Sequence, residues 1–209
     1  MAGTASVGTA QGTGPTLVCV GGAPGAGKTT VGSLVAHAAG LCIVDLDSVT
    51  TPLVEAFAAA LGDVADLDAP RFVALRDARY SCLAAVASDN LRAGRDVVAV
   101  APFTAESTDA SAWRAHGARW GADRVVLCWL DVDPEVTAGR VAQRALPRDL
   151  AKSGRGDAPR EVRAVGVAPA SEAVRGAVPV DHEEIDVVAD GTRPPEETVA
   201  RILAAVDRR

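Results

Sequence analysis

Residue types and spacing that could bind phosphate groups occur in the segment Gly22-Ala23-Pro24-Gly25-Ala26-Gly27-Lys28-Thr29, followed by Thr30. The glycines leave the backbone free to wrap an anion, so that successive N–H groups and a helix start can point at it. A lysine at position 28 can reach terminal phosphates, and the Thr29 hydroxyl can bind Mg²⁺. The segment predicts binding of ATP or GTP with Mg²⁺, and it leaves the choice of base open because the loop contacts phosphates.

Lysine is scarce in this chain, which strengthens the interpretation of Lys28. Of 21 basic residues only Lys28 and Lys152 are lysines. The planar fork of arginine cannot replace a slim ammonium group inside a phosphate cradle, which explains a lysine at position 28. Lys152 is either a second functional lysine or a surface residue.

Two carboxylates, Asp45 and Asp47, lie at the end of the expected strand Cys42–Leu46, in the segment Asp45-Leu46-Asp47-Ser48. Two residues apart on an extended chain, they share a face. One would lie near Mg²⁺ and the other near an attacking hydroxyl, as phosphoryl transfer to an alcohol requires. The alternative is that either aspartate caps the next segment. The next expected strand ends in Ala-Pro-Phe-Thr without an acidic residue, which favours Asp45 as the metal ligand.

Three arginines, Arg140, Arg144 and Arg148, occur at or just after the expected helix from Pro134 to about Ala145. Arg140 and Arg144 are four residues apart and therefore share a helix face. They precede a segment rich in Arg, Gly, Pro and Ala, about residues 146–179, which is typical of a lid or insertion. Arginines there could neutralise charge on the transferring phosphoryl group, or could be solvated surface residues.

The acceptor would occupy the space between Asp47, a helix beginning at Pro52, a long helix and the end of the third strand. Apolar walls with a few charges suit a molecule with an apolar body and an exposed hydroxyl, although the arginines also admit an anionic substituent. Thr104 and Glu106 would line the same edge or cap the following helix. The expected wall residues are Val49, Leu53, Phe57, Arg71, Phe72, Arg76, Arg79, Phe103 and Thr104.

The elements that must position these residues alternate between short apolar runs and longer helical patterns, which predicts parallel strands with crossover helices. We expect an α/β fold, a three-layer P-loop NTPase sandwich with a five-stranded, mainly parallel sheet and a lid segment. Residues 1–15 are expected to be a disordered tail and 16–209 a single domain. The expected strands are 17–21, 42–46, 97–101, 125–130 and 185–189; the expected helices are 28–39, 52–61, 70–91, one near 111, 134–145 and 196–206.

The charge and composition of the chain limit the classes of molecule that it could bind. A formal charge of -6 with three Trp, one Tyr and three Phe argues against a nucleic-acid surface, and no apolar run is long enough to span a membrane. We therefore expect a cytoplasmic protein whose substrates are a nucleoside triphosphate and a small hydroxylated molecule. The isolated cysteines Cys19, Cys42, Cys82 and Cys128 are typical of buried free thiols. A homodimer is one oligomeric state that the sequence leaves open.

The loop GGAPGAGKTT, the strand ends DLDS and APFT, and the segment RVAQRALPRDLAK together resemble the small P-loop kinases of the AAA_33 group. Its wider class includes chloramphenicol phosphotransferase, zeta toxins, gluconate kinase and shikimate kinase. The resemblance covers roughly residues 17–152 and stops at residues 153–179. It implies that Asp47 is the base or substrate anchor, that Asp45 lies near Mg²⁺, and that Arg140 lies beside the nucleotide base. It also implies that Arg144 and Arg148 are lid arginines and that residues 190–194 pass near the purine.

The resulting hypothesis is a small-molecule kinase that transfers a γ-phosphate to a substrate hydroxyl. An antibiotic or natural-product acceptor, with resistance as the outcome, is favoured by the likeness to chloramphenicol phosphotransferase. A nucleotide or nucleotide-sugar kinase is the enzymatic alternative. A nucleotide-dependent switch or binding module is the alternative of another class.

Overall fold

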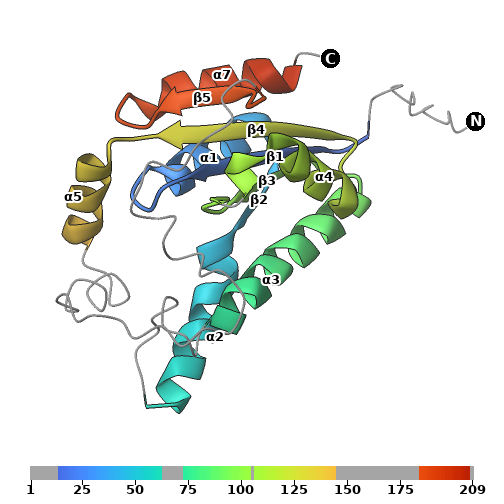
Figure 1. Cartoon of the computed structure of the whole chain (residues 1–209). Coiled ribbons are helices and arrows are strands. Elements are labelled where there is room, and N and C mark those ends of the chain that lie inside the picture. Colours follow the sequence, from blue (N-terminus) through green and yellow to red (C-terminus); the bar gives the residue numbers. More distant parts are fainter. Residues whose placement is uncertain (1–13, 63–72, 105, 145–183, 208–209) are drawn as a thin grey trace, which may run out of the picture.

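The computed structural model describes residues 14–62, 73–104, 106–144 and 184–207. Its five strands are β1 (Thr16–Gly22), β2 (Cys42–Asp45), β3 (Val97–Val100), β4 (Arg124–Asp131) and β5 (Val187–Asp190). They form one sheet in the order β2-β3-β1-β4-β5, and every neighbouring pair is parallel (Figure 1). The expected parallel α/β sheet is confirmed. All five strands therefore end at one edge, where ligands bind in such folds.

Helices cover both faces of the sheet and make three layers (Figure 1). On one face lie α1 (Lys28–Ala39) and α7 (Pro195–Asp207), and on the other lie α3 (Val73–Arg92) and α4 (Ala110–Trp120). Three further segments stand at the carboxyl edge: α2 (Leu46–Ala60), the 3-10 turn η2 (Glu106–Thr108) and α5 (Pro134–Arg144). None of the helices within the described ranges is both long and apolar enough to cross a membrane.

Alternation along the strands divides the core into two halves. Leu17 and Cys19 of β1 face the α3 and α4 layer, while Val18 and Val20 face α1 and α7. All four are at most 1% exposed, because a central parallel strand is covered on both faces. Because these strands are buried on both faces, they appear in the sequence as short continuous apolar runs.

The second helix differs most from its expected bounds. It begins at Leu46, directly after β2, and Pro52 lies inside it rather than at its start. The side chain of Asp45 accepts hydrogen bonds from the backbone N–H groups of Asp47 and Ser48, and this cap starts the helix six residues early. Asp47 is consequently in a helical turn and does not share a strand face with Asp45.

Smaller differences occur at the ends of the chain and among the cysteines. Gly14 and Pro15, expected in the tail, are hydrogen-bonded to Asp123, so the fold begins there. Cys19 and Cys128 are buried free thiols as expected, whereas Cys82 is an exposed thiol on α3. The expected tail up to residue 13, the start of the long helix at Asp68 and Pro70, and the expected lid at 146–179 lie outside the described residues.

Candidate active site

The phosphate-binding loop joins β1 to α1 at the carboxyl edge of the sheet. Gly25 has a φ of 83°, and a Cβ there would lie 2.8 Å from the backbone oxygen of Thr137 on α5. Gly27, the N-cap of α1, has a φ of 95°, and no atom lies within 4 Å of where its Cβ would be. The two glycines are therefore needed for different reasons. Gly25 lets α5 pack on the loop, and the open space at Gly27 leaves the helix N-terminus accessible to an anion.

The side chains that follow the loop point in two directions. The Nζ of Lys28 donates to the backbone oxygen of Ala23 at 2.8 Å, so its ammonium group lies back over the loop. The hydroxyl of Thr29 donates to Oδ2 of Asp45 at 2.8 Å. The loop and the end of β2, separated by 16 residues, are thus brought into direct contact.

Asp45 uses its two carboxylate oxygens differently. Oδ1 caps α2, at 2.9 Å from the nitrogen of Asp47, while Oδ2 accepts from Thr29. The residue is only 8% exposed. A threonine hydroxyl beside a carboxylate is the oxygen donor set that Mg²⁺ prefers, so Thr29 and Asp45 fit the ion. The capping and metal interpretations of Asp45 are compatible because each uses a separate oxygen.

Asp47 is held by a residue from a distant helix. The guanidinium of Arg79 on α3 forms an ion pair with its carboxylate, and Arg79 Nε donates to the Thr50 hydroxyl at 2.7 Å. The Arg79 side chain is 10% exposed and that of Asp47 is 49% exposed. The carboxylate is therefore accessible while its position is fixed. The sequence predicted Arg79 as a residue of the acceptor wall. It did not predict the ion pair with Asp47, because the two residues are 32 positions apart.

The rest of the expected acceptor wall is only partly assembled. Leu53 and Phe57 are exposed on α2, and Val49, Arg76 and Thr104 are half-buried. Phe103 differs from expectation: it is 2% exposed because its ring packs in the core, with its centroid 5.1 Å from that of Trp113. Phe103 is therefore a core residue and does not line an acceptor site. Arg71 and Phe72 lie outside the described residues.

Arg140 joins three segments beside the phosphate-binding loop. Its Nη1 donates to the backbone oxygens of Gly25, at 3.3 Å, and Gly191, at 3.0 Å. Gly191 follows β5, and a Cβ there would lie 2.6 Å from the oxygen of Ala26. The turn after β5 therefore packs directly on the phosphate-binding loop, beside Arg140. The Arg144 side chain, Arg148 and Lys152 lie outside the described residues.

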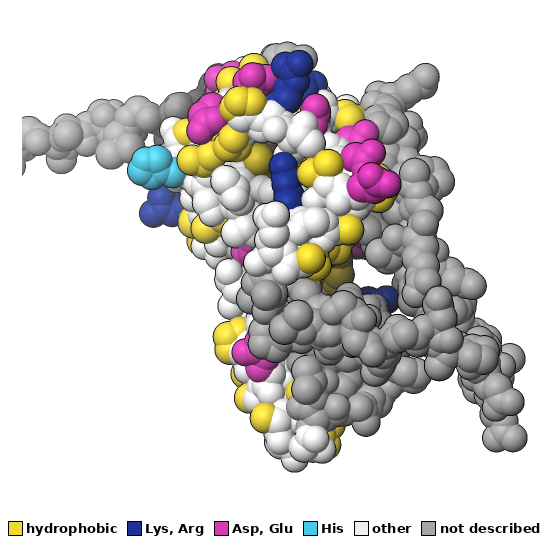
Figure 2. Space-filling model, turned by 90° about the vertical axis from the view of Figure 1, so that its left-hand side faces the viewer, with side chains coloured by type: hydrophobic (Ala, Val, Ile, Leu, Met, Phe, Trp, Pro, Cys, Tyr) yellow, Lys and Arg dark blue, Asp and Glu magenta, His cyan; other side chains and the backbone are white. Residues whose placement is uncertain are grey.

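Charge on this side of the molecule is mixed. Figure 2 presents the side of the molecule that lies at the left of Figure 1, where α5 stands. Acidic side chains gather in its upper part, with basic and apolar side chains between them. Hydrogen bonds from the hydroxyl of Thr192 and then from its backbone N–H lower the pKa of Asp190 at the end of β5.

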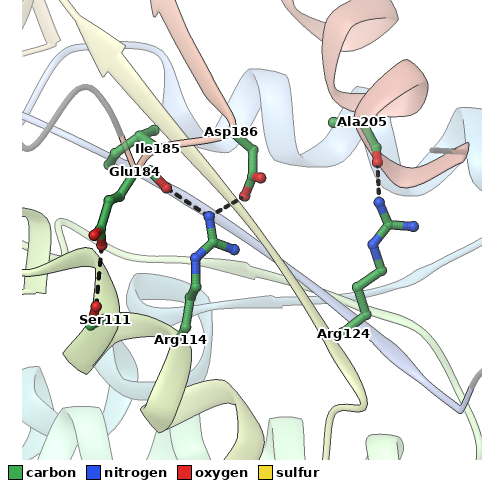
Figure 3. A pocket seen from close by; sticks show the side chains of 7 residues that line it. All are labelled: Ser111, Arg114, Arg124, Glu184, Ile185, Asp186 and Ala205. Carbon is green, nitrogen blue, oxygen red and sulfur yellow. Dashed lines mark hydrogen bonds and ion pairs between the residues drawn. The ribbon is translucent and has the colours of Figure 1, made fainter. Parts of the chain in front are cut away.

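A separate hollow of about 620 Å³ lies away from the phosphate-binding loop, beside the first residues of β4 and β5 (Figure 3). Its two arginines are already used by the fold. Arg114 donates to the backbone oxygens of Val125 and Glu184 and to Asp186. Arg124 donates to the oxygens of Ala205 and Val206 at the end of α7. These contacts hold β5 and α7 on the sheet, and the candidate active site is at the opposite end of the strands.

Comparison with known proteins agrees with this fold. Solved structures with the same fold include a gluconokinase from Sinorhizobium meliloti 1021, with 20% identity, a TM-score of 0.55 and 93% of each chain covered. An APS kinase from Mycobacterium tuberculosis, in complex with AMPPNP and APS, has 16% identity, a TM-score of 0.59 and coverage of 94% of this chain and 99% of that chain. A sugar kinase from Janibacter sp. HTCC2649 has 23% identity, a TM-score of 0.54 and coverage of 93% and 95%.

No curated protein matches the chain. The family model AAA_33, described as an AAA domain, matches residues 17–165, which is more than half of the chain. This range contains the phosphate-binding loop, Asp45, Asp47, Arg79 and Arg140. The chain has the fold of the small P-loop kinases and belongs to the AAA_33 family of AAA domains.

Proposed function

We propose that this protein is a small-molecule kinase that transfers the γ-phosphate of ATP or GTP to a hydroxyl group of its substrate. The observation that supports this most is the continuous row from Thr29 through Asp45 to Asp47. In this row the proposed metal-binding pair, Thr29 and Asp45, is nearest the phosphate-binding loop, and the accessible carboxylate of Asp47 lies beyond it. A nucleotide switch does not need the second carboxylate.

Each residue of the row has a role in the proposed reaction. Lys28 would leave the Ala23 oxygen and bind the terminal phosphates of the nucleotide. Thr29 and Asp45 would hold Mg²⁺, which neutralises phosphate charge when bound. Asp47 would accept the proton of the attacking hydroxyl, and Arg79 would keep its carboxylate oriented toward that hydroxyl.

The proposed acceptor is a hydroxylated natural product or antibiotic. Leu53 and Phe57 give α2 an exposed apolar surface on the helix that carries Asp47. Arg79 is already paired with Asp47, which leaves less free positive charge for a phosphorylated acceptor. With an antibiotic as acceptor, the protein would be a cytoplasmic enzyme that confers resistance.

The Asp47→Asn variant tests the proposed reaction. We expect the rate of phosphoryl transfer to fall by about 100-fold or more, because a general base is lost, while the dissociation constant of Mg²⁺-nucleotide stays the same. A matched control is Asp109→Asn, since Asp109 caps α4 and takes no part in the proposed row, and asparagine caps equally well. Transfer is measured with radiolabelled nucleotide against a panel of hydroxylated antibiotics, nucleotides and sugars.

Different results would assign different functions. A loss confined to Mg²⁺-nucleotide binding would make Asp47 a metal ligand and give Asp45 the other role. Efficient phosphorylation of nucleotides or sugars and of no antibiotic would replace the acceptor proposal. Hydrolysis without transfer to any member of the panel would favour a nucleotide-dependent switch.

A further inference from the structure

The backbone at the end of β3 has an unusual conformation. Phe103 has a φ of 48°, in the left-handed region, and it is the one non-glycine residue with a positive φ among the described residues. Its ring is nevertheless fully buried, between Tyr80 of α3 and Trp113 of α4. A bulky residue persists in this region only where its surroundings fix it, and such residues concentrate at functional sites.

Two hydrogen bonds connect this strained residue to both halves of the candidate site. The backbone N–H of Phe103 donates to the hydroxyl of Tyr80 at 3.1 Å. The preceding residue, Pro102, accepts at its backbone oxygen from the N–H of Gly22 at 3.2 Å. Gly22 is the first residue of the phosphate-binding loop. The series of contacts Tyr80–Phe103–Pro102–Gly22 therefore runs from α3, the helix that carries Arg79, to that loop.

Tyr80 follows Arg79 directly in α3. Consecutive residues of an α-helix point about 100° apart, so these two side chains reach different neighbours. Arg79 contacts Asp47 on α2, and Tyr80 contacts the backbone at the end of β3. One turn of α3 is thus bonded both to the proposed base and, through the β3 end, to the phosphate-binding loop.

We propose that Tyr80 is a positioning residue for phosphoryl transfer, which fixes α3 and the end of β3 relative to the phosphate-binding loop. The proposal rests on the proposed kinase function. In this proposal Tyr80 acts through Phe103 and Pro102 and not by binding the nucleotide or the metal itself. When nucleotide binds in the loop, Gly22 takes up a fixed position. The hydrogen bond from Gly22 to Pro102 then fixes Phe103 and Tyr80 as well. Asp47, which is paired with the neighbouring Arg79, is thereby aligned with the phosphate to be transferred.

The test uses Tyr80→Phe in the full-length protein, which removes a single oxygen atom. We expect transfer to fall by about 10- to 100-fold in kcat, because a small misalignment of reactants is costly, while the KM for nucleotide changes by less than about threefold. A second measurement needs no acceptor. Amide exchange at Phe103 should slow when AMPPNP and Mg²⁺ bind the wild type and should not respond to them in the variant.

The matched control is Trp113→Phe. Trp113 packs on the other side of Phe103, so the smaller ring lowers the Tm but leaves the hydrogen bond from Phe103 to Tyr80 in place. We expect this control to keep both kcat and the nucleotide response of Phe103. The proposal is overturned if Tyr80→Phe retains the nucleotide response, or if both variants lose it equally. Because that measurement uses AMPPNP and Mg²⁺ without an acceptor, it remains decisive even if the wild type phosphorylates no acceptor.

Discussion

Lys28 shows at the scale of one residue why side-chain shape matters as well as charge. Its ammonium group donates to the Ala23 oxygen within the loop, at 2.8 Å. An ammonium is a compact point charge, whereas a guanidinium is a wide planar group that needs several acceptors in one plane.

We therefore expect Lys28→Arg to be nearly as damaging as Lys28→Ala, although it keeps the positive charge. Both variants should lose about 100-fold or more in transfer rate, because the charge that stabilises the transferring phosphate is misplaced or absent. Thermal unfolding should be unchanged, since the side chain contributes to the ligand site and not to the core. Transfer by Lys28→Arg at near wild-type rate would contradict the interpretation.

At the scale of the element, Asp45 both starts α2 and belongs to the proposed metal site. The two roles can be separated because asparagine caps a helix as well as aspartate but lacks the negative charge. The helix it starts carries Asp47, Thr50 and the exposed apolar residues of the acceptor side. A fault in the cap would therefore displace the proposed base.

We expect Asp45→Asn to keep the free energy of unfolding within about 0.5 kcal/mol, because the cap is retained, and to lose most of the Mg²⁺ dependence of nucleotide binding. Asp45→Ala should lose the same Mg²⁺ dependence and a further 0.5–2 kcal/mol or so of stability, the usual cost of a lost cap. Urea unfolding and nucleotide titrations with and without Mg²⁺ measure the two effects. Equal stability of the two variants would show that the cap is unimportant for α2.

At the scale of the whole molecule, the two halves of the core enclose one thiol each. Burial raises the pKa of Cys19, on the α3 and α4 side, and of Cys128, on the α1 and α7 side, to about 12 in each case. Burial also raises the pKa of the Tyr80 phenol. All three groups retain their protons in the folded state at a pH where the unfolded chain releases them.

The folded protein should consequently lose stability as the pH rises above 9, the ordinary pKa of a thiol. Above that pH the unfolded state binds fewer protons than the folded state, so the free energy of unfolding decreases with pH. Each thiol contributes up to about 1.4 kcal/mol per pH unit. Urea unfolding between pH 8 and 11 measures the slope, and Cys128→Ala should make it shallower. An identical slope in that variant would exclude Cys128 as a contributor.

Much of the architecture and the identity of the phosphate-binding loop follow from the sequence alone. Apolar runs buried on both faces are continuous in sequence, and the loop is a contiguous motif whose glycines and lysine have fixed spacing. Local chemistry is sufficient for such features because the interacting atoms are close along the chain. The strands and α1 were therefore predicted to within one or two residues.

Tertiary structure alone decided which distant residues meet. Arg79 and Asp47 are 32 positions apart, and Tyr80 and Phe103 are 23 positions apart. Arg140 contacts Gly25 and Gly191, which are 115 and 51 positions away from it. Periodicity cannot predict such contacts, because they depend on where whole helices pack on the sheet. The same reason accounts for Phe103, whose ring was expected in the acceptor wall and is in the core. Its direction is set by a left-handed backbone whose N–H donates to Tyr80, and the ring packs against Tyr80 and Trp113.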